Sequence, residues 1–205
     1  FHKIFVLKKE QRSELDKCIG HKYPIRAGTN TDCFQQVEKK YRITYKFIDE
    51  IMNQYDYPYT ICTKSGMVTD PEYMELYKDN VNFQFSLATM NKDYHDKIER
   101  GTPLAKVRLK AMEKLSKKGF FVGCRISPFV PELMDDTEEL IKNLADSGCK
   151  HVITELLRVS PILNKIMKED SGVDFADNYK SRGVKLNLGF WRYPLEEKIN
   201  HQKRI

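Results

Sequence analysis

The chain has 205 residues, of which 40% are hydrophobic and 31% are charged, so it can bury a core and is not a disordered tail. Its 35 basic and 29 acidic residues give a net charge of +6, a mild excess that is typical of a solvated surface. No run approaches 18 apolar residues, which excludes a membrane span, and the first residues do not resemble a signal peptide. We therefore expect a cytoplasmic protein that does not associate with a membrane.

The five cysteines are widely spaced, at Cys18, Cys33, Cys62, Cys124 and Cys149. No two of them are close enough for a CxxC metal knuckle, so we expect no zinc site and no metal ligands within the chain. Their odd number and the size of the chain also argue against a disulfide framework, which fits a reducing compartment.

Short β-rich runs alternate with longer segments of helical spacing. The predicted strands are Pro24–Asn30, Tyr59–Lys64, Val81–Ala88, Phe120–Ser127 and His151–Leu156. The segments of helical spacing are Phe34–Tyr55, Asp70–Lys78, Tyr94–Lys118 and Thr137–Ser147. This alternation predicts repeated βα units, an α/β fold with a parallel sheet.

No linker divides the chain, so residues 1–205 are predicted to form a single domain. The pattern weakens after about residue 170, where Val184–Phe190 is a candidate for one further strand.

Two predicted helices have informative faces. The first carries an apolar stripe and places Glu38 at its edge; the stripe consists of Phe34, Val37, Tyr41, Ile48 and Ile51. The second has Arg108 in line with its stripe, which consists of Leu104, Ala111, Met112 and Leu115. An inward arginine needs an anionic partner or a polar cavity, although its head could also escape to water.

The predicted strands are apolar on one face, and the other face turns polar toward the carboxyl ends. This pattern favours an open or closed βα barrel in which ligands bind at those ends. The candidates for lining such a pocket are Lys64, Ser86, Arg125 and Glu155, with Thr29, Thr31 and Asp32 after the first strand. Each has a structural alternative: Lys64 could mark a strand end, Ser86 could cap a turn, and Arg125 could pair with Glu155.

Four stretches together resemble a known family. They read GTNTDCFQQVEKKYRIT (28–44), TICTKSGMVTD (60–70), NFQFSLATMNKDYHDKIERGTPLAKVRLKAMEKLSKKGF (82–120) and VGCRISPFVP (122–131). They are similar to radical S-adenosylmethionine (radical SAM) enzymes of the spore photoproduct lyase-like branch, over roughly residues 4–165. The resemblance implies a partial (β/α)6 barrel in which a reduced [4Fe–4S] cluster cleaves S-adenosylmethionine to a 5′-deoxyadenosyl radical that abstracts hydrogen from the substrate.

The resemblance also implies which residues bind the cofactor. By position, Thr31 lies near the methionyl group, Lys64 near the carboxylate and Ser86 near the ribose, while Glu99 and Arg108 match a recurrent pair beside the cofactor. Arg125 joins this set through the polar strand faces. No catalytic residue is assigned.

The chain departs from the family pattern at the cluster. It contains no CxxxCxxC motif and lacks the usual first strand, so the cluster ligands are expected upstream of Phe1. Cys33 stands where proline is usual, and Thr29 stands where the spore lyase has its hydrogen-donating cysteine. The resemblance implies a reductant such as a flavodoxin or a ferredoxin and raises nucleic acid as a substrate.

Two other functions remain open. One is a βα-barrel binding module without a cluster or catalysis. The other is a cofactor-free lyase that uses Lys64 as a Schiff-base amine.

Overall fold

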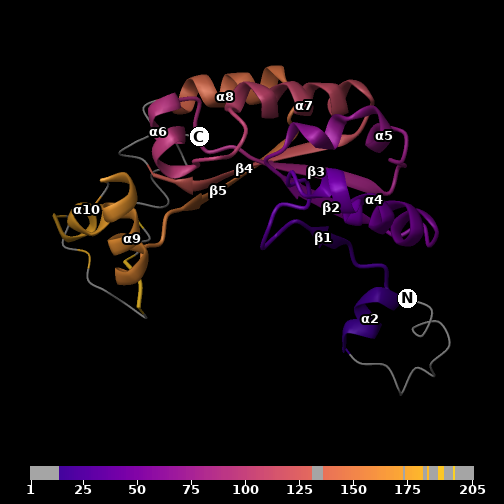
Figure 1. Ribbon diagram of the computed structural model, residues 1–205, viewed down its shortest axis with the longest axis horizontal. Helices are drawn as coiled ribbons and strands as arrows, with labels where there is room; N and C mark the ends of the chain where they lie inside the picture. Colours follow the sequence, from indigo (N-terminus) through magenta and orange to yellow (C-terminus); the bar gives the residue numbers. More distant parts are fainter. Residues whose placement is uncertain are drawn as a thin grey trace.

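A computed structural model of the chain describes residues 14–130, 136–172, 174–181, 184, 189–191 and 196. Its centre is a five-stranded sheet in the order β1-β2-β3-β4-β5, with every neighbouring pair parallel (Figure 1). The strands are β1 (Ile25–Ala27), β2 (Tyr59–Thr63), β3 (Val81–Ser86), β4 (Phe121–Phe129) and β5 (His151–Leu156). The predicted α/β class, the parallel sheet and the expected partial barrel are confirmed.

Helices connect the strands and flank the sheet. They are α2 (Glu14–Gly20), α3 (Glu38–Tyr41), α4 (Ile43–Lys46), α5 (Pro71–Met74), α6 (Lys92–Ile98), α7 (Ala105–Lys117), α8 (Thr137–Asp146), α9 (Pro161–Ser171) and α10 (Phe175–Ser181). A π-helix, Phe47–Asn53, continues α4, and a 3-10 helix, Gly66–Thr69, follows β2. In Figure 1, α5, α7 and α8 lie along one side of the sheet, while α9 and α10 lie beyond β5. None of the described helices is both long and apolar enough to cross a bilayer.

Alternate side chains of each central strand lie on opposite faces. In β3, Val81, Phe83 and Phe85 are buried against the helices, whereas Asn82 is exposed and Gln84 and Ser86 are half-buried. In β4, Val122, Cys124 and Ile126 are likewise buried on one face, and Gly123 and Phe129 are buried as well. The predicted apolar and polar faces are therefore confirmed, and the polar face is the open face of the sheet.

The predicted helix Phe34–Tyr55 is wrong as a single element. The chain breaks at Arg42, which has a left-handed backbone with φ +56° and separates α3 from α4. The buried carboxylate of Glu38 accepts the backbone N–H groups of Thr44 and Tyr45 at 2.9 and 3.0 Å, which holds the chain in this turn. The continuous stripe fails as a consequence: Val37 and Tyr41 are about half exposed, although Phe34 and Ile48 are buried.

Other boundaries also differ from the prediction. The segment Tyr94–Lys118 forms two helices, α6 and α7, and Asp70–Lys78 is helical only over α5. Leu104 is exposed because it precedes α7 as its N-terminal flanking residue. The inward placement of Arg108 is confirmed, since this side chain is fully buried. The candidate strand Val184–Phe190 falls mostly outside the described residues.

Candidate functional site

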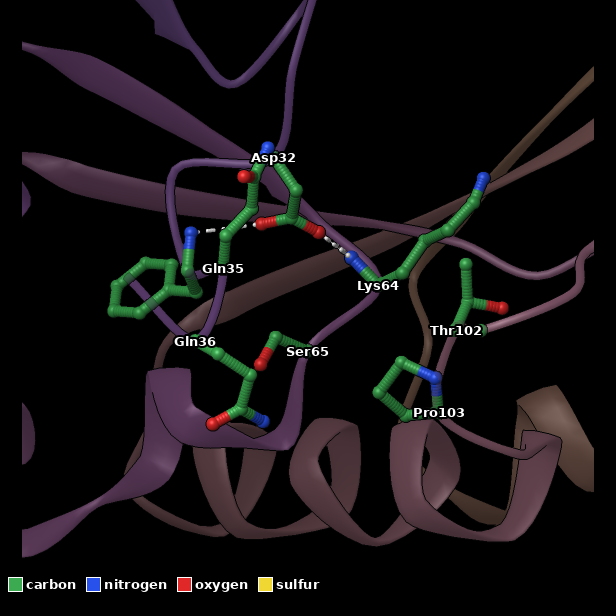
Figure 2. A pocket seen from close by; sticks show the side chains of 9 residues that line it. Asp32, Gln35, Gln36, Lys64, Ser65, Thr102 and Pro103 are labelled. Carbon is green, nitrogen blue, oxygen red and sulfur yellow. Dashed lines mark hydrogen bonds between the residues drawn. The ribbon is translucent and has the colours of Figure 1, made fainter. Parts of the chain in front are cut away.

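Two cavities meet at the carboxyl ends of the first three strands. The smaller, of about 200 Å³, lies toward the open face and is lined by Gly28, Thr29, Asn30, Thr31, Asp32, Cys62, Thr63, Lys64 and Ser86. The larger, of about 470 Å³, is drawn in Figure 2 and is lined by Asp32, Phe34, Gln35, Gln36, Lys64, Ser65, Gly101, Thr102 and Pro103. Asp32 and Lys64 belong to both linings, so they form the boundary between the two cavities.

The carboxylate of Asp32 fixes the loop that follows β1. Its Oδ1 accepts hydrogen bonds from the N–H of Phe34 at 2.9 Å and from the hydroxyl of Thr63 at 2.8 Å; Figure 2 shows how Asp32 lies in the cavity wall. Its Oδ2 accepts the N–H of Lys64 at 2.6 Å. These bonds join the loop to the end of β2, so Asp32 positions the site and does not itself offer a free carboxylate.

Gly28 lets this loop approach β2 closely. Its φ is +84°, a conformation that favours glycine, and a Cβ at this position would lie 2.2 Å from the carbonyl oxygen of Cys62. Because that neighbour is backbone, no side-chain rotation could relieve the clash. Glycine here brings Thr29 and Thr31 to the cavity wall.

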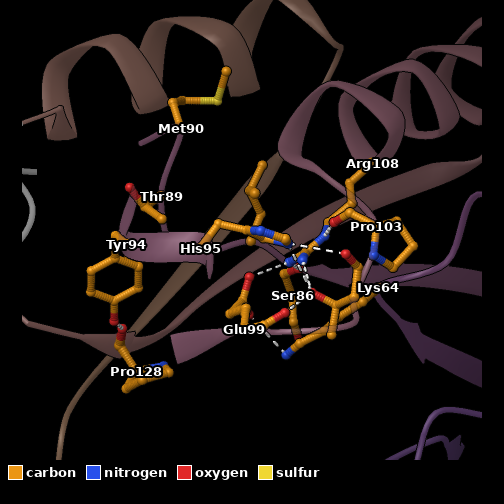
Figure 3. A network of polar contacts seen from close by, with 12 residues as sticks. Lys64, Ser86, Thr89, Met90, Tyr94, His95, Glu99, Pro103, Arg108 and Pro128 are labelled. Carbon is orange, nitrogen blue, oxygen red and sulfur yellow. Dashed lines mark hydrogen bonds and ion pairs between the residues drawn. The ribbon is translucent and has the colours of Figure 1, made fainter. Parts of the chain in front are cut away.

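A buried ion pair lies behind Ser86 (Figure 3). Arg108 is fully buried, and its Nη1 lies 2.8 Å from Oε2 of Glu99, whose side chain is 4% exposed. Arg108 also donates to the carbonyl oxygens of Ser86 at 2.7 Å and Pro103 at 2.8 Å, and to the hydroxyl of Thr102 at 2.7 Å. All three guanidinium nitrogens thus have partners, which explains how the helix can bury an arginine.

Lys64 completes this network from the cavity side. Its Nζ lies 3.1 Å from Oε1 of Glu99, and about a third of its side chain is exposed. That Oε1 atom is buried, yet it accepts no hydrogen bond from any described group, because the approach of Lys64 is an ion pair without hydrogen-bond geometry. An additional donor, such as a ligand ammonium, would satisfy it.

His95 and Thr102 support the pair from behind. The Thr102 hydroxyl donates to the carbonyl oxygen of Glu99 at 2.6 Å, and His95 Nε2 lies 3.0 Å from the carbonyl oxygen of Thr102. The turn before α7 is thereby tied to the end of α6, which fixes Glu99 and Arg108 relative to each other.

The structure brings together most of the predicted site residues. Lys64, Glu99 and Arg108 form one network, and Ser86 contributes its backbone to the same network and its side chain to the smaller cavity. Thr31 lines that cavity from the opposite loop, where its hydroxyl accepts from Gln35. Their roles toward a cofactor stay predictions.

Arg125 stands apart from this network. It forms an ion pair with Glu155, which also pairs with Arg158 at 2.8 Å, and it lines neither cavity. The hydrogen bond from Arg125 and its charge hold the pKa of Glu155 below its usual value. The structural alternative for Arg125, pairing with Glu155, is therefore the contact that the structure shows.

The cysteines offer no metal site in the described part of the chain. All five are free thiols, and no group of three or more histidine, cysteine, aspartate or glutamate side chains among the described residues could hold a metal ion. Burial, reinforced by the neighbouring Asp32, raises the pKa of the Cys33 thiol to about 12. Its thiolate form is therefore disfavoured.

Sequence reasoning missed Thr102 and Gln35 as parts of the site. Thr102 lies in a Gly-Thr-Pro turn, where no periodicity reports the direction of a side chain. Gln35 lies in the irregular segment before α3, which was expected to be helical. The only available signal was their closeness in sequence to Thr31, Glu99 and Arg108.

Comparison with known proteins gives one family match. The family model described as "Radical SAM superfamily" matches residues 22–144, which is more than half of the chain. This range contains the loop after β1, the end of β2 and the buried ion pair.

Curated relatives include an uncharacterized protein, ORF301, of Acidianus two-tailed virus, 34% identical over 106 residues, or 48% of this chain and 35% of that protein. The uncharacterized protein Rv2578c of Mycobacterium tuberculosis is 27% identical over 147 residues, or 69% of this chain and 43% of that protein. The chain thus spans well under half the length of the curated relatives that it matches.

Among solved structures, the chain is similar to spore photoproduct lyase complexed with dinucleoside spore photoproduct, with a TM-score of 0.65 and 19% identity. A mutant of the same lyase with bound AdoMet and dinucleoside spore photoproduct gives a TM-score of 0.68 and 20% identity. Each match covers 92% of this chain and 59% of the other. The likeness shows a shared fold.

Proposed function

Because the chain belongs to the radical SAM superfamily, we propose that it is the barrel of a radical SAM enzyme of the spore photoproduct lyase-like branch, whose fold it shares. It binds S-adenosylmethionine at the carboxyl ends of β1 to β3. When bound, the cofactor and a reduced [4Fe–4S] cluster supply a 5′-deoxyadenosyl radical that abstracts hydrogen from a substrate.

The residues present fit the amino-acid end of S-adenosylmethionine. That end carries one carboxylate and one ammonium. The Lys64 ammonium faces the cavity and suits the carboxylate, while the unsatisfied Oε1 of Glu99 suits the ammonium. The hydroxyl of Ser86 and that of Thr31 line the same cavity and can bind the ribose and the methionyl group.

The single observation that carries this proposal is the buried Glu99 between two cations. Arg108 holds one oxygen in place through an ion pair of 2.8 Å, and the other oxygen faces Lys64 without accepting a hydrogen bond. The Lys64 ammonium offsets the charge of this oxygen, and a ligand donor would add the hydrogen bond that it lacks. The ion pair with Glu99 also holds the Lys64 ammonium in place. A fixed ammonium suits a carboxylate ligand better than Schiff-base chemistry, which needs a neutral amine.

The cluster needs ligands that the described residues do not offer, so no step is assigned to them. The proposal expects cluster ligands other than the described residues and a reductant such as a flavodoxin or a ferredoxin. The lyase structures contain a dinucleoside spore photoproduct, and this likeness is the reason for proposing a nucleic-acid substrate here.

The test measures binding and cleavage of S-adenosylmethionine by the natural protein. Equilibrium dialysis gives the affinity for S-adenosylmethionine, and chromatography gives the 5′-deoxyadenosine released after anaerobic reconstitution and reduction. Lys64→Ala is expected to weaken binding by about tenfold or more, since a charge-assisted contact is lost. Lys39→Ala, which removes an exposed lysine on α3, is the matched control.

The outcomes separate the alternatives. Binding that depends on Lys64, with release of 5′-deoxyadenosine, supports the enzyme. No binding in the wild-type protein, or equal binding by both variants, contradicts the proposed site. Reconstitution without iron uptake would favour the cluster-free binding module.

A further inference from the structure

A second polar cluster lies on the open face of the sheet, next to the proposed cofactor site. It consists of Arg26 on β1, Cys62 on β2 and Gln84 on β3. Arg26 Nη2 donates to Oε1 of Gln84 and lies 3.4 Å from Sγ of Cys62, which in turn lies 3.6 Å from the same Gln84 oxygen. The predicted site residues include neither Arg26 nor Gln84.

The sheet register places this cluster directly beside the cofactor residues. Ser86 pairs with Arg125 across the strands, and two residues earlier Gln84 pairs with Cys62 on one side and Gly123 on the other. Two residues along a strand are about 7 Å, so the cluster forms the next layer toward the amino ends.

The cluster offers hydrogen-bond donors and a positive charge. Arginine can only donate, so the Gln84 atom that it contacts is the amide oxygen, and the amide NH₂ is directed elsewhere. Within the described residues, Arg26 has no carboxylate partner, and no acceptor is found for its Nε and Nη1 or for the Gln84 NH₂. The nearest acidic side chain on this face of β5, Glu155, is already bound by Arg125 and Arg158.

We propose that Arg26, oriented by Gln84 and Cys62, binds an oxyanion of the substrate, either a phosphate or a carboxylate. The guanidinium fork matches two oxygens of such a group, and the Gln84 NH₂ adds a third donor. Arg26 is exposed, so a ligand can reach it. Arg26 is therefore a specificity-determining residue of this site.

The link to substrate rests on the proposed function. A hydrogen atom can be abstracted only from a group in contact with the cofactor. If the cofactor is bound by Lys64 and Ser86, the layer of side chains that contains Arg26 is the surface next to it, so a substrate there would be within reach. The binding of an oxyanion itself depends only on the Arg26 cluster.

The experiment is isothermal titration calorimetry of the natural protein with two probes, in the presence and absence of S-adenosylmethionine. A 5′-phosphorylated thymidine dinucleotide represents phosphate, and citrate represents carboxylate. Arg26→Gln is expected to weaken binding of the preferred probe by about tenfold or more. Arg100→Gln removes an exposed arginine that pairs with Asp170, and it should leave that binding unchanged.

If Arg26→Gln does not fold, Arg26→Lys replaces it, and a loss of about threefold is expected because lysine lacks the planar fork. Arg26-dependent binding of the dinucleotide supports a phosphate-bearing substrate, and Arg26-dependent binding of citrate supports a carboxylate. The inference is overturned if neither probe binds, or if Arg26→Gln and Arg100→Gln lose affinity equally. Oxyanion binding without affinity for S-adenosylmethionine would refute only the proposed cofactor site, so the two failures are distinguishable.

Discussion

Replacing Arg108 tests whether the buried ion pair organises the site. Arg108→Met keeps an unbranched apolar stem but removes the guanidinium group and its charge. The buried Glu99 then loses its closest cation, and the carbonyl oxygens of Ser86 and Pro103 lose their donor. Breaking a buried pair from one side costs about 3–5 kcal/mol, so we expect the free energy of unfolding to fall by about 4 kcal/mol.

The assay is urea unfolding followed by circular dichroism at neutral pH. With a slope of about 2 kcal/mol per M, a loss of about 4 kcal/mol moves the urea midpoint down by about 2 M. The matched control is Arg125→Met, because Arg125 and Glu155 are each about one third exposed and Arg158 still reaches Glu155. This control should lose less than about 1 kcal/mol.

A second comparison separates the lost pair from a general packing defect. Glu99→Gln combined with Arg108→Met removes both charges, so the double variant should lose less stability than the two single losses added together. The reasoning is refuted if Arg108→Met and Arg125→Met shift the midpoint equally, or if the double variant shows no coupling.

Two further predictions concern the segments that shape the site. Burial opposes ionisation of Glu38, but hydrogen bonds from Thr44, Tyr45 and Tyr73 outweigh burial and lower the pKa of the carboxyl group below 4.5. The ionised carboxylate therefore stabilises the fold above pH 4.5, and this stabilisation is lost as the pH falls through the pKa of Glu38 in the folded protein. Glu38→Gln should therefore lower the unfolding free energy at pH 7 by about 1–3 kcal/mol and flatten its fall between pH 5 and 3, and an unchanged acid slope in urea titrations would contradict this. Gly28→Ala should destabilise the protein by more than about 2 kcal/mol and abolish binding of S-adenosylmethionine, since the new Cβ meets backbone. Gly101→Ala has a similar positive φ with nothing within 4 Å, so thermal unfolding should show a loss of only about 1 kcal/mol, and equal losses would argue against a clash at Gly28.

The local pattern determined the architecture. Alternation along β3 and β4 separated the buried face from the open face correctly, because burial on a pleated strand repeats every two residues. Helical spacing likewise placed Arg108 inward, since its neighbours at four-residue intervals are buried except at the exposed helix start.

Tertiary structure decided what the sequence pattern could not. The chain turns at Arg42 because the Glu38 carboxylate captures backbone donors beyond it, so the predicted continuous helix is broken. The spacing of apolar residues indicates only which residues are buried or exposed. It carries no information about hydrogen bonds between a side chain and the backbone, such as those that Glu38 accepts.

The site itself depends on distant pairings. Lys64 and Glu99 are 35 positions apart, and Arg26 meets Gln84 across 58 positions. Spacing along the chain indicated that Lys64 lay at a strand end, but only the order and register of the parallel strands fixed which charges share one cavity. The sequence by itself therefore determined the layers of the barrel, whereas long-range packing selected the partners within it.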